Sequence, residues 1–172
     1  MNKHTVIVII ASIVIGGTVG HSIWNVFAIE SLKIASPEQG KFSYFDLMND
    51  GEIVMCNSLP FYVNVEEFQI VIFYDGEHKG TFTANPTTIS PQSASIIELD
   101  FRSELFVDSQ YLFLHLDGEF SGTQPIRLDP TKMFVATNVD SPLIGVIPYT
   151  ISHTYTGFDF YNMMKDRENF AC

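Results

Sequence analysis

The sequence predicts an all-β fold, an antiparallel β-sandwich preceded by one N-terminal transmembrane helix. Three observations support this prediction. A long stretch near the start of the chain contains no charged residue, turn-forming pairs recur at short intervals after it, and runs rich in β-branched and aromatic residues separate these turns. A chain of 172 residues is long enough for one domain with its own core, with the apolar stretch as an appendage.

The uncharged stretch runs from Thr5 to Ala28 and is 24 residues long. As a helix it would measure roughly 36 Å, which exceeds the ~30 Å thickness of the hydrocarbon core of a bilayer. A single span must be helical in lipid, because a helix satisfies its own backbone groups. Lys3 precedes the stretch and Glu30 follows it. Residues 1–4 are therefore expected in the cytoplasm, residues 5–28 in the lipid bilayer of the cell membrane, and the bulk of the chain outside.

A cleaved signal peptide is the alternative interpretation of the same stretch. Its apolar region would be Thr5–Ile15, and a peptidase could cut after Gly20. The apolar character continues beyond that point through Ile23 to Phe27, and Trp24 suits the aromatic belt at a membrane interface. These features favour a retained anchor. Both interpretations export the rest of the chain.

Residues 29–41 are predicted to be a linker, in which Leu32, Ile34 and Ala35 could begin a first strand. Residues 42–172 are predicted to form the extracytoplasmic sandwich. Turn signals occur at Asn49–Gly51, Asp75–Gly76, Asn85–Pro86, Asp117–Gly118, Ser121–Gly122 and Asp140–Pro142. The predicted strands are Phe42–Met48, Glu52–Asn57, Glu66–Tyr74, Lys79–Ala84, Ser93–Arg102, Tyr111–Leu116, Met133–Thr137 and Leu143–His153. Strands at this spacing without helices between them favour a sandwich. In the tail, Phe158–Asn169, a helix is an alternative.

The exported part is strongly acidic. All 20 acidic residues follow residue 29, with 8 of the nine basic ones, so this part carries a net charge of −12. Such a surface repels phosphate backbones, and nucleic acid is therefore excluded as a partner. Solubility is the ordinary explanation of the negative charge. The functional alternative is that the charge attracts cations or a basic partner.

Cys56 and Cys172 are the only two cysteines. Outside the cell an even pair is compatible with one disulfide, which would tie the end of the chain to an early strand. The alternative is a buried thiol at Cys56 and a free one at Cys172. The spacing alone leaves both interpretations open.

No catalytic or cofactor-binding residue can be assigned from the sequence. It contains no nucleophile elbow, phosphate-binding loop or zinc-protease motif, so we expect neither an enzyme nor a cofactor. His115, Asp117 and Glu119 are spaced by two, and on a continuous strand they would share a face as three metal ligands. Asp117–Gly118 is also a turn signal, however, and a turn explains these residues without a metal. They are therefore weak metal candidates.

The tail of the chain is rich in aromatic residues and methionine. The ordinary explanation is a last strand and helical cap that close one end of the sandwich. The functional alternative is an exposed patch that binds a partner, because such residues are enriched at interfaces. The residues of this patch would be Tyr155, Phe158, Phe160, Tyr161, Met163 and Met164.

The stretch Cys56–Gly80, "CNSLPFYVNVEEFQIVIFYDGEHKG", resembles the LEA14, or water-stress-and-hypersensitive-response (WHy), family. Asn57, Pro60, Tyr74 and Gly76 occur in the order of the family's pattern, and "TTISPQSASIIELDF" is also similar. Two residues separate the asparagine from the proline here, whereas the family usually has them adjacent. The second half of the chain matches only as generic strands. The resemblance implies an immunoglobulin- or fibronectin-like sandwich without a catalytic centre, linked to desiccation and stress protection, in a version anchored at its N-terminus like some archaeal membrane proteins.

These observations together predict a non-enzymatic, membrane-anchored binding or scaffolding module, an accessory component of a membrane protein complex. Tethering would raise its effective concentration toward another membrane or cell-surface protein. The first alternative is a LEA14-like surface protein that protects against desiccation or osmotic stress. The second alternative is a metal-binding protein that uses the three spaced residues of the predicted metal site.

Overall fold

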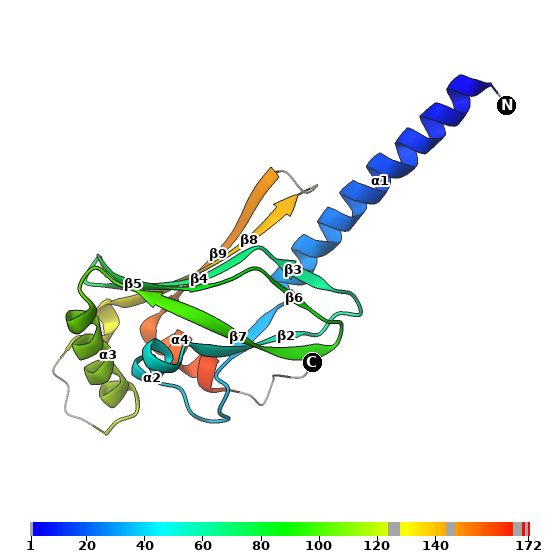
Figure 1. The fold of residues 1–172 in the computed structure, drawn as a ribbon. Helices are drawn as coiled ribbons and strands as arrows, with labels where there is room; N and C mark the ends of the chain where they lie inside the picture. The colour runs from blue at the N-terminus through cyan, green and yellow to red at the C-terminus, as the bar shows by residue number, and fades with distance from the viewer. Residues whose placement is uncertain (1, 124–127, 144–146, 167–169, 171) are drawn as a thin grey trace.

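The computed structural model describes residues 2–123, 128–143, 147–166, 170 and 172 (Figure 1). A long helix precedes a β-rich domain in which three shorter helices are interspersed. The elements are α1 (Lys3–Glu30), β1 (Lys33–Ala35), α2 (Tyr44–Asp50), β2 (Glu52–Asn57), β3 (Val63–Val65), β4 (Glu67–Tyr74), β5 (Glu77–Ala84), β6 (Thr87–Ile89), β7 (Ser93–Arg102), α3 (Phe106–Phe120), a single turn η1 (Pro130–Lys132), β8 (Met133–Leu143), β9 (Ile147–Thr156) and α4 (Gly157–Lys165).

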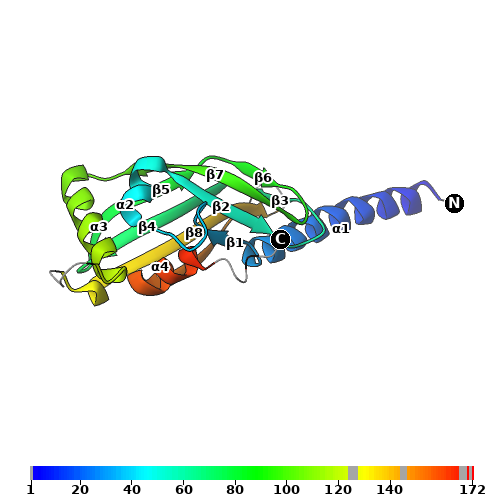
Figure 2. The same ribbon diagram turned by 90° about the horizontal axis from the view of Figure 1, so that it is seen from below.

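Seven strands form one antiparallel sheet in the order β1-β2-β7-β5-β4-β8-β9, and β3 pairs with β6 in a separate two-stranded ribbon. The seven-stranded sheet curls into a half-barrel, with α2, α3 and α4 at one end (Figures 1 and 2). Its two edges are β1 and β9. Alternation decides which side is buried, since Phe68, Ile70 and Ile72 of β4 are buried while the residues between them are half-buried.

The antiparallel, β-rich class is therefore confirmed, but the immunoglobulin-like sandwich is not. Among the described residues, the layer that covers the seven-stranded sheet consists of helices rather than of a second large sheet. Two segments that were predicted as strands are helical: most of Phe42–Met48 lies in α2, which begins at Tyr44, and all of Tyr111–Leu116 lies in α3. Asp117–Gly118 lies inside α3 and Asp140–Pro142 inside β8, so neither is a turn.

Local signals explain why α2 is a helix despite its aromatic residues. The Ser43 hydroxyl accepts a hydrogen bond from the backbone N–H of Asp46, which caps the first turn. The helix ends at Gly51, whose φ of 66° is left-handed. A Cβ at this position would overlap the carbonyl oxygen of Leu99, so glycine is required for both reasons.

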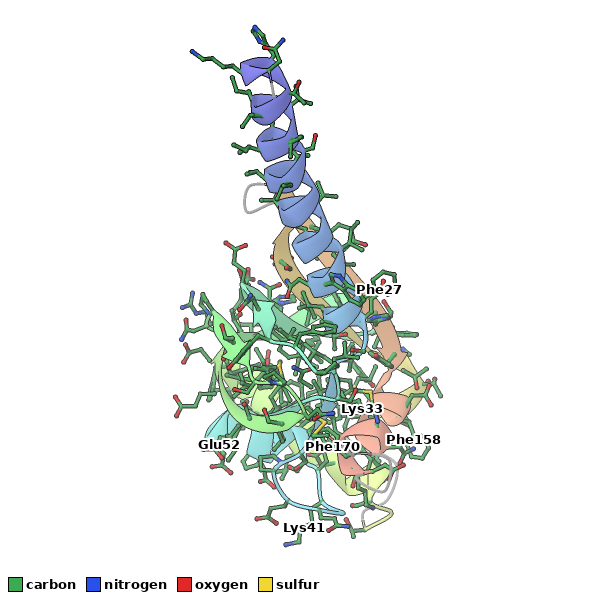
Figure 3. All side chains as sticks on the ribbon, turned by 90° about the vertical axis from the view of Figure 1, so that its right-hand side faces the viewer. Phe27, Lys33, Lys41, Glu52, Phe158 and Phe170 are labelled. Carbon is green, nitrogen blue, oxygen red and sulfur yellow. A yellow bond between two sulfur atoms is a disulfide. The ribbon has the colours of Figure 1, made fainter. Side chains whose placement is uncertain are left out.

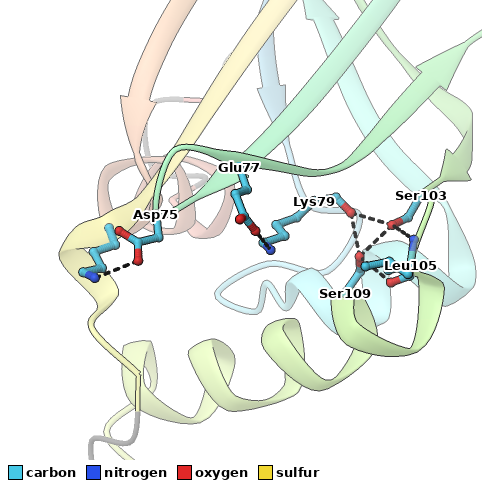
Figure 4. A network of polar contacts seen from close by, with 7 residues as sticks. Asp75, Glu77, Lys79, Ser103, Leu105 and Ser109 are labelled. Atoms are coloured by element: carbon cyan, nitrogen blue, oxygen red, sulfur yellow. Dashed lines mark hydrogen bonds and ion pairs between the residues drawn. The ribbon is translucent and has the colours of Figure 1, made fainter.

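Tertiary packing stabilises α3. Leu112, Phe113 and Leu116 are buried on one side of it, at helical spacing. Near its N-terminal end, the hydroxyls of Ser103 and Ser109 both donate to the carbonyl of Lys79 in β5, at 2.7 and 2.6 Å (Figure 4). The same view shows the ion pairs Lys79–Glu77 and Lys132–Asp75, which lie at the β4–β5 turn.

The core lies between the concave side of the sheet and the three short helices. Four large aromatic side chains that are completely buried meet there: Tyr44, Phe82, Phe113 and Phe160. The Tyr44 hydroxyl donates to the carbonyl of Gly157 at 2.7 Å, which joins α2 to the start of α4. Burial of these rings, each of which removes a large apolar area from water, is the main stabilising term of the domain.

The helix α1 is long and apolar enough to cross a membrane, by length and composition. It does not leave the domain through a flexible linker. Ser22, Asn25, Ala28 and Ile29 are buried, so one face of its last two turns belongs to the domain. The predicted linker, 29–41, contains β1, which pairs with β2 in the register Ile34↔Met55. The last turns of the predicted membrane segment therefore pack against the domain, and the segment 29–41 is partly strand.

Candidate functional site

An apolar cavity of about 380 Å³ lies where the two edges of the half-barrel approach each other. It extends from the last turn of α1 to α4, and the edge strands β1 and β9 lie on opposite sides of it. The cavity therefore occupies the seam at which this sheet does not close into a complete barrel. Its volume lies within the range of small-molecule sites, which is about 300–1,000 Å³.

The strand register explains why the floor of the cavity is apolar. Val139 of β8 lies opposite Phe68 of β4 on one side and opposite Ile151 of β9 on the other. These three side chains are buried and line the cavity. Ile29 of α1 and Met163 of α4 line it at either end. The wall is thus contributed by segments from both ends of the chain.

Polar side chains gather at the mouth. Glu30, Lys33, His153 and Asp166 line the cavity and are all exposed, in contrast to the buried floor. Thr137, which is buried and lies opposite His153 in the β8–β9 register, is a polar residue within the wall. An apolar interior with a few polar groups at its entrance is typical of a site that encloses an apolar ligand and orients its polar end.

The three predicted metal ligands are not brought together. They lie on a helix, where a spacing of two residues turns side chains to different sides, so Asp117 faces away from His115 and Glu119. The carboxylate of Glu119 accepts the backbone N–H of Leu128, and a ring nitrogen of His115 contacts the carbonyl of Tyr111. In the described part of the chain no group of His, Cys, Asp and Glu side chains is arranged to hold a metal ion.

Asp117 instead holds the start of α2. Its carboxylate accepts hydrogen bonds from the Ser43 hydroxyl and from the backbone N–H groups of Tyr44 and Phe45, at 2.8–2.9 Å. Burial nevertheless raises the pKa of Asp117 to about 6, because desolvation of the charged form outweighs the three donors. Burial and the charge of Asp117 also raise the pKa of Tyr44 well above its ordinary value.

The two cysteines are brought together. Cys56 in β2 and Cys172 form a disulfide with a Cα–Cα distance of 5.5 Å, so the end of the chain is tied to the sheet near the cavity. Phe170, two residues earlier, is part of the cavity lining.

The residues of the predicted aromatic patch differ in burial and in position. Phe160, Tyr161 and Met164 are buried in the core, Tyr155 and Met163 line the cavity, and Phe158 is exposed. They therefore do not form one exposed surface. The part of the predicted tail that lies in α4, up to Lys165, is helical, and residues 167–169 lie outside the described part.

Two groups of residues at this site are not identifiable from the sequence pattern. The cavity floor looked like ordinary strand residues, and only the apolar alternation at Val139 and Ile151 hinted at burial. Asn25 was counted within the membrane segment, although an asparagine in an otherwise apolar helix is a signal of a specific contact.

Comparisons with known proteins leave the chain without a family. No family model matches it, and no curated protein matches it. The resemblance to the LEA14 family therefore stays a prediction. Among solved structures, the chain is similar to a protein from Archaeoglobus fulgidus, with 17% identity and a TM-score of 0.34 over 73% of this chain and 94% of that chain. A TM-score this low does not support any conclusion about fold or function.

Proposed function

We propose that the protein is a single-pass, membrane-anchored extracytoplasmic module that binds rather than catalyses, and that its ligand is the acyl chain of a membrane lipid. The observation that carries the proposal is the apolar cavity, which opens beside the end of the helix that is long enough to span the membrane. A cavity with a buried apolar floor and an exposed polar mouth suits a chain with a polar head.

The position of the cavity along α1 supports a ligand from the membrane. A hydrocarbon core of ~30 Å needs about 20 helical residues, and counted from Lys3 this length ends at Ile23. Ile29, which lines the cavity, lies only roughly 9 Å farther along the helix axis. The cavity therefore begins at the depth of the lipid headgroups.

Two features support export of the domain. Lys3 precedes the span, and positive charge favours the cytoplasmic side for this end. The disulfide between Cys56 and Cys172 suits an oxidising compartment, because thiols are kept reduced in the cytosol. An apolar side chain of another membrane protein is the alternative occupant of the cavity, which would make the module an accessory subunit.

Photocrosslinking of the full chain in lipid nanodiscs tests the proposal. The probe is phosphatidylcholine with a diazirine on one acyl chain, and labelled peptides are identified by mass spectrometry. We expect labelling of α1, which reports the span, and of β4 around Phe68, which reports the cavity. Ile151→Trp should fill the cavity and lower the labelling of β4 several-fold without changing that of α1.

Ile96→Trp is the matched control, because Ile96 is exposed on β7 and outside the cavity lining. It should leave both labels unchanged. Labelling of α1 without labelling of β4 in the unmodified chain would refute the lipid as ligand, and a protein that co-purifies in its place would support the accessory-subunit alternative. Absence of any label on α1 would refute the anchor.

The acidic surface supports a second candidate function, protection against drying or osmotic stress as the LEA14 resemblance implies. The net charge of −12 in residues 30–172 would hold a hydration layer around the domain. This candidate requires that a deletion strain survive drying less well than its parent. It also requires that Ile151→Trp restore survival fully, since a filled cavity leaves the surface unchanged.

A further inference from the structure

We propose that the loop Ser58–Tyr62, together with Trp24 and Phe27 of α1, lies in the headgroup layer of the bilayer that α1 crosses. The domain would then sit on the membrane in one orientation rather than swing on a tether. This inference rests on the proposed anchor. It adds a second, peripheral contact between the domain and lipid that the anchor by itself does not require.

The first step is the rigid junction between α1 and the domain. The side-chain amide of Asn25 donates to the carbonyl of Asn64 at 3.1 Å and accepts the backbone N–H of Asn64 at 3.0 Å, as a neighbouring strand would. It also donates to the hydroxyl of Ser141 in β8. All three bonds are at least partly buried, so α1 is fixed to both β3 and β8.

The second step is depth. The hydrocarbon core that begins after Lys3 ends near Ile23, after about 20 residues. The ring of Trp24, the next residue, contacts the ring of Phe61 edge-to-face, with 5.4 Å between the centroids. Because the junction is rigid, the loop that carries Phe61 lies at the level of the interface whenever α1 spans the bilayer.

The third step is the loop itself, whose backbone is held in place. Leu59 and Phe61 pack partly against the core, while Tyr62 at the end of the loop remains exposed. The Asn57 side chain donates to the carbonyl of Phe61 at 2.8 Å and accepts the N–H of Leu59 at 3.0 Å. Gln92 donates its N–H to the carbonyl of Leu59 at 3.0 Å. Tyr62 nevertheless has 63% of its surface exposed, and Trp24 has 61%. Exposed aromatic rings on the loop and on the adjacent helix, Tyr62 and Trp24, are unusual for a surface that faces only water.

The fourth step is the groove between helix and loop. It has a volume of about 890 Å³ and is lined by Trp24, Phe27, Leu59, Pro60, Phe61 and Tyr62, with Asn25 and Ser31 as its polar residues. Tryptophan and tyrosine favour the headgroup level of a bilayer, because their rings are apolar at one end and form hydrogen bonds at the other.

The fifth step is charge. The stretches 53–65, 80–97 and 141–158 contain no Asp, Glu, Lys or Arg, although the exported part has a net charge of −12. The loop, β3, β6 and the paired ends of β8 and β9 belong to these stretches, and they lie on the side of the domain from which α1 emerges (Figure 1). Figure 3 shows Phe27 at this end, whereas Lys41 and Glu52 lie toward the opposite end. These stretches therefore add no charge to the surface beside α1, although Glu66 and Asp140 border them in the sequence and Glu30 ends α1.

Depth-dependent fluorescence quenching tests this inference, because Trp24 is the only tryptophan in the chain. The full chain is reconstituted into phosphatidylcholine vesicles whose acyl chains are brominated near the headgroup. Two reporters are compared in the Trp24→Phe background, Tyr62→Trp in the loop and Tyr111→Trp on α3. Tyr111 is similarly exposed but belongs to α3, which lies at the far end of the domain from α1 (Figure 1).

We expect the tryptophan at position 62 to be quenched at least half as strongly as Trp24 in the unmodified chain, at low and at high salt alike. The tryptophan at position 111 should not be quenched. Quenching of Trp24 with none at position 62 would overturn the inference and leave the anchor standing. No quenching of Trp24 itself would overturn the anchor, and the inference with it.

Discussion

Single polar side chains join elements that no backbone hydrogen bonds connect. Asn25 pairs with the backbone of Asn64 and so completes the edge of β3 from within a helix. Asp117, which lies in α3, accepts hydrogen bonds from the Ser43 hydroxyl and from two backbone N–H groups at the start of α2. Both satisfy partly buried donors that would otherwise be left unpaired at a cost of about 1–3 kcal/mol each.

Asp117 should make stability depend on pH. Its folded-state pKa of about 6 lies above its ordinary value of 3.8, so the folded protein binds the proton more tightly than the unfolded chain. The stabilisation of the folded state by protonated Asp117 is therefore fully present below pH 3.8, and it is lost as the pH rises through 6. A shift of this size corresponds to at most ~3 kcal/mol.

Urea unfolding of the full chain and of Asp117→Asn between pH 4 and 7 measures this contribution. The free energy of unfolding of the unmodified chain minus that of the variant should fall as the pH rises. The variant also loses hydrogen bonds, which adds an offset independent of pH. A difference that stays constant or increases with pH would contradict the assigned pKa.

At the scale of elements, α4 closes the helical end of the half-barrel. Phe160 and Met164 are completely buried on one side of it. The N–H of Ser36, the residue after β1, donates to the carbonyl of Met164 at 2.8 Å, which holds α4 against this edge of the sheet. Phe158, two residues before Phe160, points to the opposite side and is 51% exposed. The same helix thus offers a buried and an exposed phenylalanine.

Phe160→Ala should lower the free energy of unfolding by about 3–5 kcal/mol, because it removes a buried ring and leaves a cavity. Phe158→Ala is the matched control and should change it by no more than about 0.5 kcal/mol. Thermal and urea unfolding of the full chain measure both. Equal effects of the two substitutions would show that α4 does not close the core as described.

At the scale of the whole molecule, the disulfide joins the last residue to the second strand of the sheet. Cys56 and Cys172 are 116 residues apart in sequence, so their bond restricts most of the unfolded domain. In the chain-entropy model a loop of this length is worth about 4–5 kcal/mol. The bond also holds the segment that follows α4 near the cavity.

Cys172→Ser should therefore lower the free energy of unfolding by up to ~5 kcal/mol, with the cavity floor intact. A reducing agent should lower the melting temperature of the unmodified chain and leave that of Cys172→Ser unchanged. A reducing agent that lowers neither melting temperature would contradict a structural role for the bond.

Local pattern predicted the strands better than the helices. Ser93–Arg102 alternates clearly, and Glu66–Tyr74 is rich in β-branched and aromatic residues; they form β7 and β4 with nearly the predicted bounds. Tyr111–Leu116 is apolar except for His115, and short apolar runs fit a strand and a buried helix equally well. The segment is helical because Leu112, Phe113 and Leu116 are then buried together in the core. The residues they pack against are distant in sequence.

The sequence by itself determined the apolar N-terminal helix, the antiparallel β-rich class and the pair of cysteines available for a bond, because these follow from composition and local periodicity. The tertiary structure alone decided that the sheet curls into a half-barrel, that helices cover it, and that its two edges leave a cavity. It also decided that Asn25 belongs to the domain and that Asp117 caps a helix. The physical reason is that each of these features arises between residues far apart in the chain, such as Phe68, Val139 and Ile151, whose local sequences describe only ordinary strands.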